Sequence, residues 1–217
     1  MKEKLSLDAV IKEAKVFAEI ESKHNETLIY GTTDGKAVGT YIEQKFKRYL
    51  LEKYEFTEGN SAKGIDFPDL DLEIKTTSIK QPQSSCPYSA ARQKVFGLGY
   101  SIILFVYEKK DAPQTKTANL NFLHTIFIHS SKTGDYQLTK TIREYLDNGA
   151  IKEEIVALLF DRNLPLDDII ANSIADEILI KKPEQGYLTI SNALQWRLQY
   201  GRAIQVAGTV DGVKKLI

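Results

Sequence analysis

Residues 64–75 read Gly-Ile-Asp-Phe-Pro-Asp-Leu-Asp-Leu-Glu-Ile-Lys, and they carry the clearest strand pattern of the chain. Over residues 70–75 apolar and polar side chains alternate, which is typical of a strand with one buried face. The Phe-Pro-Asp sequence at 67–69 indicates a turn, so the whole stretch predicts a β-hairpin. Its second strand places Leu72 and Ile74 on one face and Asp71, Glu73 and Lys75 on the other.

Two amphipathic helices are expected before this stretch. Apolar residues recur at intervals of three and four over residues 6–23 and again over residues 36–54. After the stretch, residues 79–90 contain two prolines, two glutamines and several serines, which indicates a loop. Residues 91–96 are expected to form a short helix.

A buried central strand is expected at residues 101–107, because they form a continuous apolar run between turn signals. A further strand is expected at 120–129, and a tight turn at 210–213. From about residue 138 the pattern is helical, with helices predicted at 142–146, 151–160, 166–179 and 190–198. This order predicts an α/β fold, with a mixed central sheet flanked by helices over residues 1–135 and a C-terminal helical region over residues 136–217.

The composition is that of a soluble globular protein. Of the 217 residues, 42% are apolar and 27% are charged, and 29 Lys+Arg balance 29 Asp+Glu. Zero net charge argues against a protein that coats nucleic acid by bulk charge, although it leaves room for a local basic cleft. A single cysteine, a charged N-terminus and the lack of an apolar run of roughly 20 residues lead us to expect a cytoplasmic protein.

The strongest set of chemical groups is Asp66 with Glu73 and Lys75. Two carboxylates that converge from adjacent strands can hold Mg²⁺, which prefers a few oxygen ligands and keeps several waters for a phosphate substrate. A lysine beside the attacking water would stabilise the negative charge that develops on the phosphate. These three residues therefore point to metal-dependent phosphodiester hydrolysis.

The two segments Gly64-Ile65-Asp66-Phe67-Pro68 and Glu73-Ile74-Lys75-Thr76-Thr77 resemble the motif of the PD-(D/E)XK nuclease superfamily, which includes type II restriction endonucleases. The resemblance implies a restriction-endonuclease-like fold, with Asp66 and Glu73 as metal ligands and Lys75 as the residue that assists the nucleophile. It also implies a further acid on the preceding helix, where Glu43 stands. The gap between Asp66 and Glu73 is most similar to that of the methyl-directed mismatch-repair nicking endonuclease and its restriction-enzyme relatives.

Other interpretations of these residues stay open at this point. The literal Pro-Asp pair falls at Pro68-Asp69, so Asp69 competes with Asp66 as first ligand; Asp66 is preferred because Asp69 lies within the predicted turn. Glu73 and Lys75 could instead be charges on a solvated hairpin face. Glu43 could form a surface pair with Lys47 one helical turn away, which would stabilise the helix by only about 0.3–0.5 kcal/mol.

A nuclease also needs side chains that contact DNA. Basic residues near the motif are candidates for phosphate contacts, which add salt dependence but no sequence information: Lys36, Lys45, Lys47, Arg48, Lys63, Lys80, Arg92 and Lys94. Polar residues of the following loop are candidates for contacts with base edges: Gln81, Gln83, Ser84, Ser85 and Tyr88. An ordinary polar loop with solvated basic side chains explains the same residues equally well.

The end of the chain allows two interpretations. Residues 190–198, a turn at 199–201 and residues 202–206 could form a helix-turn-helix that contacts DNA through Arg197 and Arg202. A helical cap on the α/β core is the simpler interpretation and is preferred, because helix pairs joined by short turns are common.

The resemblance to type II restriction endonucleases implies Mg²⁺-dependent cleavage of double-stranded DNA at a short specific sequence. It also implies a homodimer, since a two-fold protein matches a palindromic site, and a cognate DNA methyltransferase as functional partner. A repair nickase or junction resolvase on the same fold is an alternative. A DNA-binding protein without catalysis is another, although the intact acidic residues and lysine argue against it.

Overall fold

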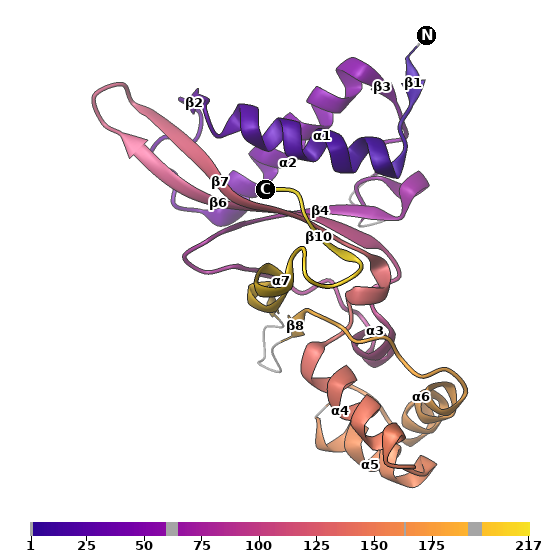
Figure 1. The fold of residues 1–217 in the computed structure, drawn as a ribbon. Coiled ribbons are helices and arrows are strands. Elements are labelled where there is room, and N and C mark those ends of the chain that lie inside the picture. Colours follow the sequence, from indigo (N-terminus) through magenta and orange to yellow (C-terminus); the bar gives the residue numbers. More distant parts are fainter. Residues whose placement is uncertain (1, 60–64, 163, 191–196) are drawn as a thin grey trace. The chain divides into compact units, whose positions relative to one another are not determined.

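The computed structural model describes residues 2–59, 65–162, 164–190 and 197–217 (Figure 1). The chain forms two compact units. The first unit comprises Met1–Ser84, Ser101–Ile128 and Val206–Ile217, and the second comprises Ser85–Tyr100 and His129–Gln205. The predicted boundary between regions 1–135 and 136–217 differs from this division, which places residues 85–100 and 129–135 in the second unit and residues 206–217 in the first.

The first unit is built on a mixed sheet. Its strands are β2 (Asn25–Glu26), β4 (Leu72–Ser78), β6 (Ser101–Ala112), β7 (Thr117–Ile128) and β10 (Val213–Lys215). They lie in the order β10-β7-β6-β4, and β2 pairs with β7. Strands β4 and β6 run parallel, whereas β7 is antiparallel to its neighbours β6, β10 and β2. The mixed central sheet predicted from the sequence is therefore confirmed.

Strand β6 is buried along its apolar run, as the sequence predicts. Leu104 and Phe105 have no exposed surface. The parallel pairing of β4 with β6 places Glu73 beside Ile102 and Lys75 beside Leu104. Because a buried strand holds its neighbour by a continuous hydrogen-bond ladder, the backbone that carries Glu73 and Lys75 is firmly positioned.

Two helices cover one face of this sheet, α1 (Leu7–Glu21) and α2 (Gly35–Lys53) (Figure 1). Both predicted helices are thus confirmed. Each begins at a side-chain cap, since Ser6 accepts a hydrogen bond from the backbone N–H of Ala9 and Asp34 accepts one from Lys36. A short parallel pair, β1 (Glu3–Lys4) and β3 (Tyr54–Glu55), joins the start of α1 to the end of α2.

Aromatic residues hold the helices on the sheet. Phe17 of α1, Phe46 of α2 and Phe105 of β6 pack with ring centroids 5.0–5.8 Å apart. Burial of each such side chain contributes about 1.5–3 kcal/mol to folding. Helix α2, which bears Glu43, is therefore fixed against the strands by its apolar face.

The β-hairpin predicted at residues 64–75 is wrong. Gly64 lies outside the described residues, residues 65–66 are not in a strand, and Pro68–Leu70 forms a short 3₁₀ helix, η1. Phe67 and Leu72 form one isolated antiparallel bridge, and Asp71 turns the chain into β4 with a φ of 45°. The physical reason is that proline fits the first turn of a helix well, and aspartate tolerates the left-handed conformation.

The second unit is mainly helical. Its helices include α3 (Ala91–Phe96), α4 (Tyr136–Asp147), α5 (Lys152–Asp161), α6 (Asp168–Ile180) and the short 3₁₀ helix η2 (Ser130–Lys132). They pack around a core that contains Ile142, Ile155, Leu159, Ile174 and Ile178. The helices predicted at 91–96, 151–160 and 166–179 are confirmed, with small shifts at their ends. None of the helices in the described ranges is long and apolar enough to cross a membrane.

The helix predicted at residues 190–198 is wrong at both of its described ends. Residues 191–196 lie outside the described residues, but β8 (Thr189–Ile190) and β9 (Arg197–Gln199) are antiparallel strands in which Ile190 pairs with Leu198. The preferred helical cap and the alternative helix-turn-helix both place a helix here, so both fail at residues 190 and 197–198. The second helix of either arrangement is observed as α7 (Gly201–Val206), and the predicted turn at 210–213 is confirmed by a bridge between Val210 and Val213. A short strand, β5 (Gln83–Ser85), lies within the predicted loop.

Candidate active site

Three segments of the first unit bring the predicted site residues together. Helix α2 carries Glu43 and, one turn later, Lys47. The segment before η1 carries Asp66, and strand β4 carries Glu73 and Lys75. Helix α2 packs against β4, so the helix acid and the strand residues come from neighbouring elements.

Asp66 is held by two hydrogen bonds that link the helix to the strand. Its Oδ1 accepts from Lys47 Nζ at 2.6 Å, and its Oδ2 accepts from the backbone N–H of Ile74 at 2.7 Å. The next residue, Phe67, is buried and pairs with Leu72, which fixes the backbone on either side. Asp66 is thus tied to the backbone of Ile74, the residue of β4 that lies between Glu73 and Lys75 in the chain.

Lys47 joins two acids with one ammonium group. Its Nζ donates to Glu43 Oε1 at 2.8 Å as well as to Asp66, and 11% of its side chain is exposed. Burial acts to lower the pKa of Lys47, but its hydrogen bonds to Asp66 and Glu43 outweigh this effect and raise the pKa. Lys47 therefore stays charged and balances the two carboxylates.

Glu43 lies in a different electrostatic environment. Burial raises the pKa of this carboxyl, and the negative charge of Asp66 raises it further, against the opposing effect of Lys47. Its side chain is 38% exposed, so it is the acid of the cluster that is open to solvent. The pair that the sequence suggests between Glu43 and Lys47 exists, but it is part of a larger, partly buried network that includes Asp66.

Glu73 and Lys75 form a second pair on one face of β4. Lys75 Nζ donates to Glu73 Oε1, and both side chains are largely buried. The other carboxylate oxygen, Glu73 Oε2, is buried and has no hydrogen-bond partner among the described residues. A buried carboxylate oxygen without a partner is unfavourable in an otherwise satisfied protein, and such atoms are found at sites that bind an ion or a substrate.

The carboxylates of the cluster suit a magnesium ion. In the described part of the chain, no three His, Cys, Asp or Glu side chains gather closely enough to hold a metal by themselves. Mg²⁺ nevertheless needs only one or two carboxylates, because it keeps waters and takes phosphate oxygens from the substrate. Asp66 and Glu43 already share one cation, the ammonium of Lys47, and Glu73 Oε2 offers a further oxygen. The residues therefore fit the ion.

The two candidates for the first acid differ in their surroundings. Asp69 is exposed in η1, whereas Asp66 contacts Lys47 and the backbone of β4. This difference favours Asp66 as the first acid of the site, in agreement with the choice made from the sequence.

The loop residues proposed to contact DNA follow the end of β4 in the chain. Thr77 accepts a hydrogen bond from the backbone N–H of Gln83 at 3.0 Å and donates to the backbone carbonyl of Gln81 or Gln83. These contacts shape the loop and leave the side chains of Lys80 and Gln81 exposed. Ser84 and Ser85 follow in β5.

Four of the other proposed DNA contacts take part in packing or pairing within the second unit. Tyr88 and Lys94 are buried, the hydroxyl of Tyr88 donates to the carbonyl of Thr133, and burial lowers the pKa of Lys94. Arg92 pairs with Glu177, and the guanidinium of Arg202 lies 4.4 Å from the ring centroid of Tyr136. Arg197 lies in β9.

Lys47 is the site residue whose role the sequence did not indicate. The sequence suggested it as a surface partner of Glu43 or a phosphate contact. One feature of the sequence could have indicated its role: Lys47 stands one helical turn after Glu43, so the two side chains lie on the same side of α2. The structure shows that this side adjoins the loop that carries Asp66.

The structure combines a mixed sheet flanked by helices with an acid on a helix, an aspartate in a loop and an acid-x-lysine strand. The resemblance found in the sequence led us to expect this combination in a type II restriction enzyme, and comparison with known proteins finds the same class. The sequence model of the family "Type II restriction enzyme NspV" matches residues 4–215. The type II restriction enzyme NspV of a Nostoc strain is 58% identical over 209 residues, which cover 96% of this chain and 95% of that protein. The chain therefore belongs to the NspV family of type II restriction enzymes. No solved structure matches it.

Proposed function

We propose that this type II restriction enzyme cleaves double-stranded DNA at a short specific sequence with Mg²⁺, through a PD-(D/E)XK active site. The observation that carries the proposal is the network in which Lys47 joins Glu43 to Asp66, beside the Glu73–Lys75 pair on β4. Membership of the NspV family supports the reaction, and the network supports the choice of residues.

Each residue has a distinct role in the proposed reaction. Asp66 and Glu73 would hold Mg²⁺, which when bound lowers the pKa of water and polarises the scissile phosphate. Lys75 donates a hydrogen bond to the attacking water and stabilises the negative charge that develops in the transition state. The backbone N–H of Ile74 orients the carboxylate of Asp66 through a hydrogen bond. The ammonium of Lys47 donates hydrogen bonds to both Asp66 and Glu43 and so holds the two carboxylates close to each other.

The test is cleavage of unmethylated phage DNA in Mg²⁺, with the products separated on a gel. We expect discrete bands from the wild-type protein and none in EDTA. Lys75→Ala and Asp66→Asn should each lower the rate at least about a hundredfold, because each removes a group that acts on the reacting phosphate or its metal. Asp69→Asn is the matched control and should cut normally, since Asp69 is exposed outside the network. Full activity of Lys75→Ala would overturn the proposed site.

We further propose that the enzyme is a homodimer and that it acts in the cytoplasm, where it would encounter foreign DNA. We also propose that a cognate DNA methyltransferase protects the same sequence in the host's own DNA. A two-fold dimer would suit a palindromic site, because such a site presents one scissile bond on each strand and the dimer supplies one active centre for each. Genomic DNA from the producing cell should resist cleavage, whereas the same DNA amplified without methylation should be cut. Cutting of both would contradict protection by methylation, and nicking of one strand alone would point to a repair enzyme.

A further inference from the structure

Strands β6 and β7 continue past the end of their neighbour β4 as a two-stranded ribbon (Figure 1). Strand β4 ends at Ser78, beside Tyr107, and the following backbone N–H, that of Ile79, donates to the carbonyl of Tyr107. Beyond this point β6 and β7 stay paired up to Ala112 opposite Thr117. At the rise of a strand, the ribbon therefore reaches about 17 Å beyond the end of β4.

The base of the ribbon is anchored to the rest of the first unit. Strand β2 pairs with β7 at Asn119, and the side-chain amide of Asn119 donates to the backbone carbonyls of Ser22 and His24, each at 2.9 Å. An isolated two-stranded hairpin is only marginally stable in water, so these contacts matter for its position. They hold the turn at residues 113–116, which we call the ribbon tip, at the end of a supported arm.

Two residues of the ribbon tip stabilise the turn, and the other two are open to solvent. Pro113 restricts the backbone at the first position, and the hydroxyl of Thr115 lies 2.7 Å from that of Thr117. Gln114 and Lys116 are exposed, and within the described residues their side chains form no hydrogen bond or ion pair. The ribbon tip therefore presents one amide and one ammonium group on a restrained backbone.

Lys116 has a backbone conformation that lysine disfavours. Its φ is 52°, in the left-handed region, where glycine or asparagine is preferred at the end of a hairpin turn. Asp71 is the other non-glycine residue of the described ranges with a positive φ, and aspartate tolerates this region better than lysine does. An exposed turn residue that keeps a disfavoured conformation indicates that its side chain has a function.

Lys116 is also the unbalanced charge of the ribbon. Lys109 pairs with Asp111, and Lys110 pairs with Glu108, so the charges of the β6 strand cancel each other. The ribbon tip contains no acidic residue, and Lys116 is its single charged residue. An unbalanced cation at the end of a projecting arm is suited to bind an anion.

We infer that the ribbon tip is a DNA-binding element outside the active site, with the ammonium of Lys116 on a backbone phosphate and Gln114 beside it in the groove. The major groove admits a two-stranded β-ribbon, and DNA is the polyanion on which this family of enzymes acts. The ribbon leaves the sheet where Lys80 follows Ile79, so it would extend the DNA contacts proposed for that loop. The inference rests on DNA as the substrate in the proposed function, but not on the proposed catalytic residues.

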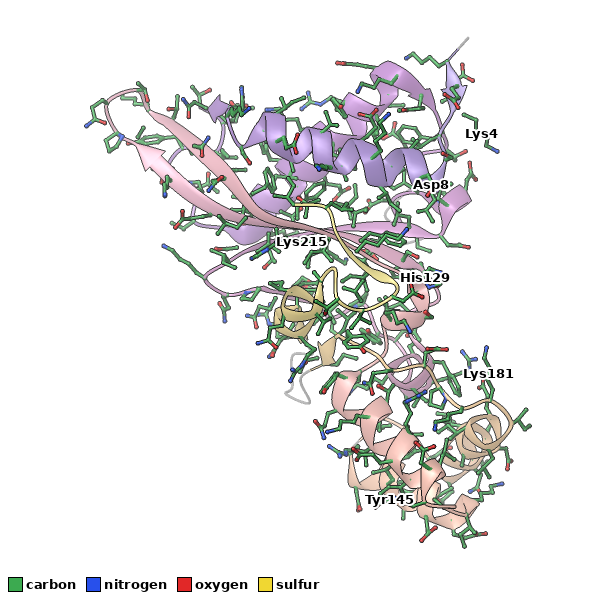
Figure 2. The ribbon with its side chains drawn as sticks, viewed as in Figure 1. Lys4, Asp8, His129, Tyr145, Lys181 and Lys215 are labelled. Atoms are coloured by element: carbon green, nitrogen blue, oxygen red, sulfur yellow. The ribbon has the colours of Figure 1, made fainter. Side chains whose placement is uncertain are left out.

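The experiment measures binding of the full chain to a fluorescein-labelled DNA duplex of arbitrary sequence, by anisotropy in EDTA at several salt concentrations. Lys116→Gln should reduce the slope of log K against log salt by about 0.9 for each copy bound, which weakens binding about eightfold per copy at roughly 0.1 M salt. Lys116→Arg keeps the charge and should keep the wild-type slope. Lys4→Gln is the matched control, because Lys4 is exposed in β1, at the end of the unit away from the ribbon (Figure 2).

Lys116→Gly separates DNA binding from a role in folding. Glycine favours the left-handed conformation, so this variant should unfold at a urea concentration at least as high as the wild type, yet bind DNA as weakly as Lys116→Gln. A wild-type salt slope in Lys116→Gln, or an equal loss in Lys4→Gln, would overturn the inference. A change in self-association without a change in DNA binding would also overturn it and assign the ribbon tip to a contact between copies. Binding in EDTA involves no cleavage, so either result leaves the Lys75→Ala test of the active site independent.

Discussion

Lys47 is the residue on which the positions of two carboxylates depend. Its ammonium is within 2.6 Å of Asp66 and 2.8 Å of Glu43, so these acids face one positive charge. Removal of one partner from a largely buried ion pair leaves an uncompensated charge, which costs more than the pair itself contributed. The site is therefore expected to be less stable without this lysine than without any single exposed lysine.

Lys47→Met should lower the free energy of unfolding by about 1–3 kcal/mol in EDTA, less than for a fully buried pair because Glu43 is partly exposed. Part of this loss should return in Mg²⁺ or Ca²⁺, because a divalent cation can balance the same two carboxylates. Urea unfolding with and without the metal measures both effects. Lys36→Met, at an exposed lysine of α2, is the control and should change neither value. A Lys47→Met variant that is as stable as the wild type in EDTA would contradict this role.

The sequence indicated the acids and the lysine of the proposed active site but not the role of Lys47. Asp66, Glu73 and Lys75 were found because residue type and spacing along the chain are sufficient to suggest their chemistry. The role of Lys47 depends on how α2 packs against β4 and on the course of the loop that carries Asp66. Such contacts join residues from different elements, and no local pattern encodes them.

At the level of elements, hydrogen bonds donated to the carboxylate of Glu26 couple β2 to the segments beside it. Its carboxylate accepts from the backbone N–H of Leu28 at 3.0 Å and from the hydroxyl of Tyr41 on α2 at 2.9 Å. The backbone hydrogen bond is the main reason why the pKa of Glu26 is lowered to about 2, and burial opposes it. A carboxyl whose pKa is lower in the folded state stabilises the fold above its unfolded pKa and loses this contribution as the pH falls.

Glu26→Gln should therefore destabilise the protein at pH 7 and have a smaller effect as the pH falls from about 5 toward 2, the interval between the unfolded and folded pKa values. The measurement is the urea midpoint of the variant and the wild type at several pH values. Glu19→Gln, at an exposed glutamate of α1, should show no such convergence. A Glu26→Gln effect that stays constant down to pH 3 would disprove the coupling.

Elements with a strong local pattern were predicted correctly, and those set by pairing were not. The apolar faces of α1 and α2 and the apolar run of β6 each identify their element from nearby residues alone. Ile190 and Leu198 also fit one face of a helix, but the structure pairs them across β8 and β9. The spacing of Ile190 and Leu198 is compatible with one helix and with two paired strands. Which of the two forms depends on the pairing of β8 with β9, and the apolar periodicity does not predict that pairing.

At the scale of the whole molecule, the proposed homodimer and the active site should be linked through the reaction products. If each copy supplies one active centre, a palindromic site is cut on both strands only while two copies are bound. A weaker dimer spends more time as single copies on the DNA. The two strands should then be cut in separate events, and a nicked intermediate should accumulate.

Dilution of the wild-type enzyme should therefore convert supercoiled plasmid first to nicked circles and only later to linear DNA, once the concentration is low enough for sedimentation to find single copies. Raising the enzyme concentration should restore direct linearisation, because mass action refills the dimer. Lys75→Ala should yield neither product at any concentration. Direct linearisation at concentrations where sedimentation finds a monomer would show that one copy cuts both strands, and would separate the proposed dimer from the reaction.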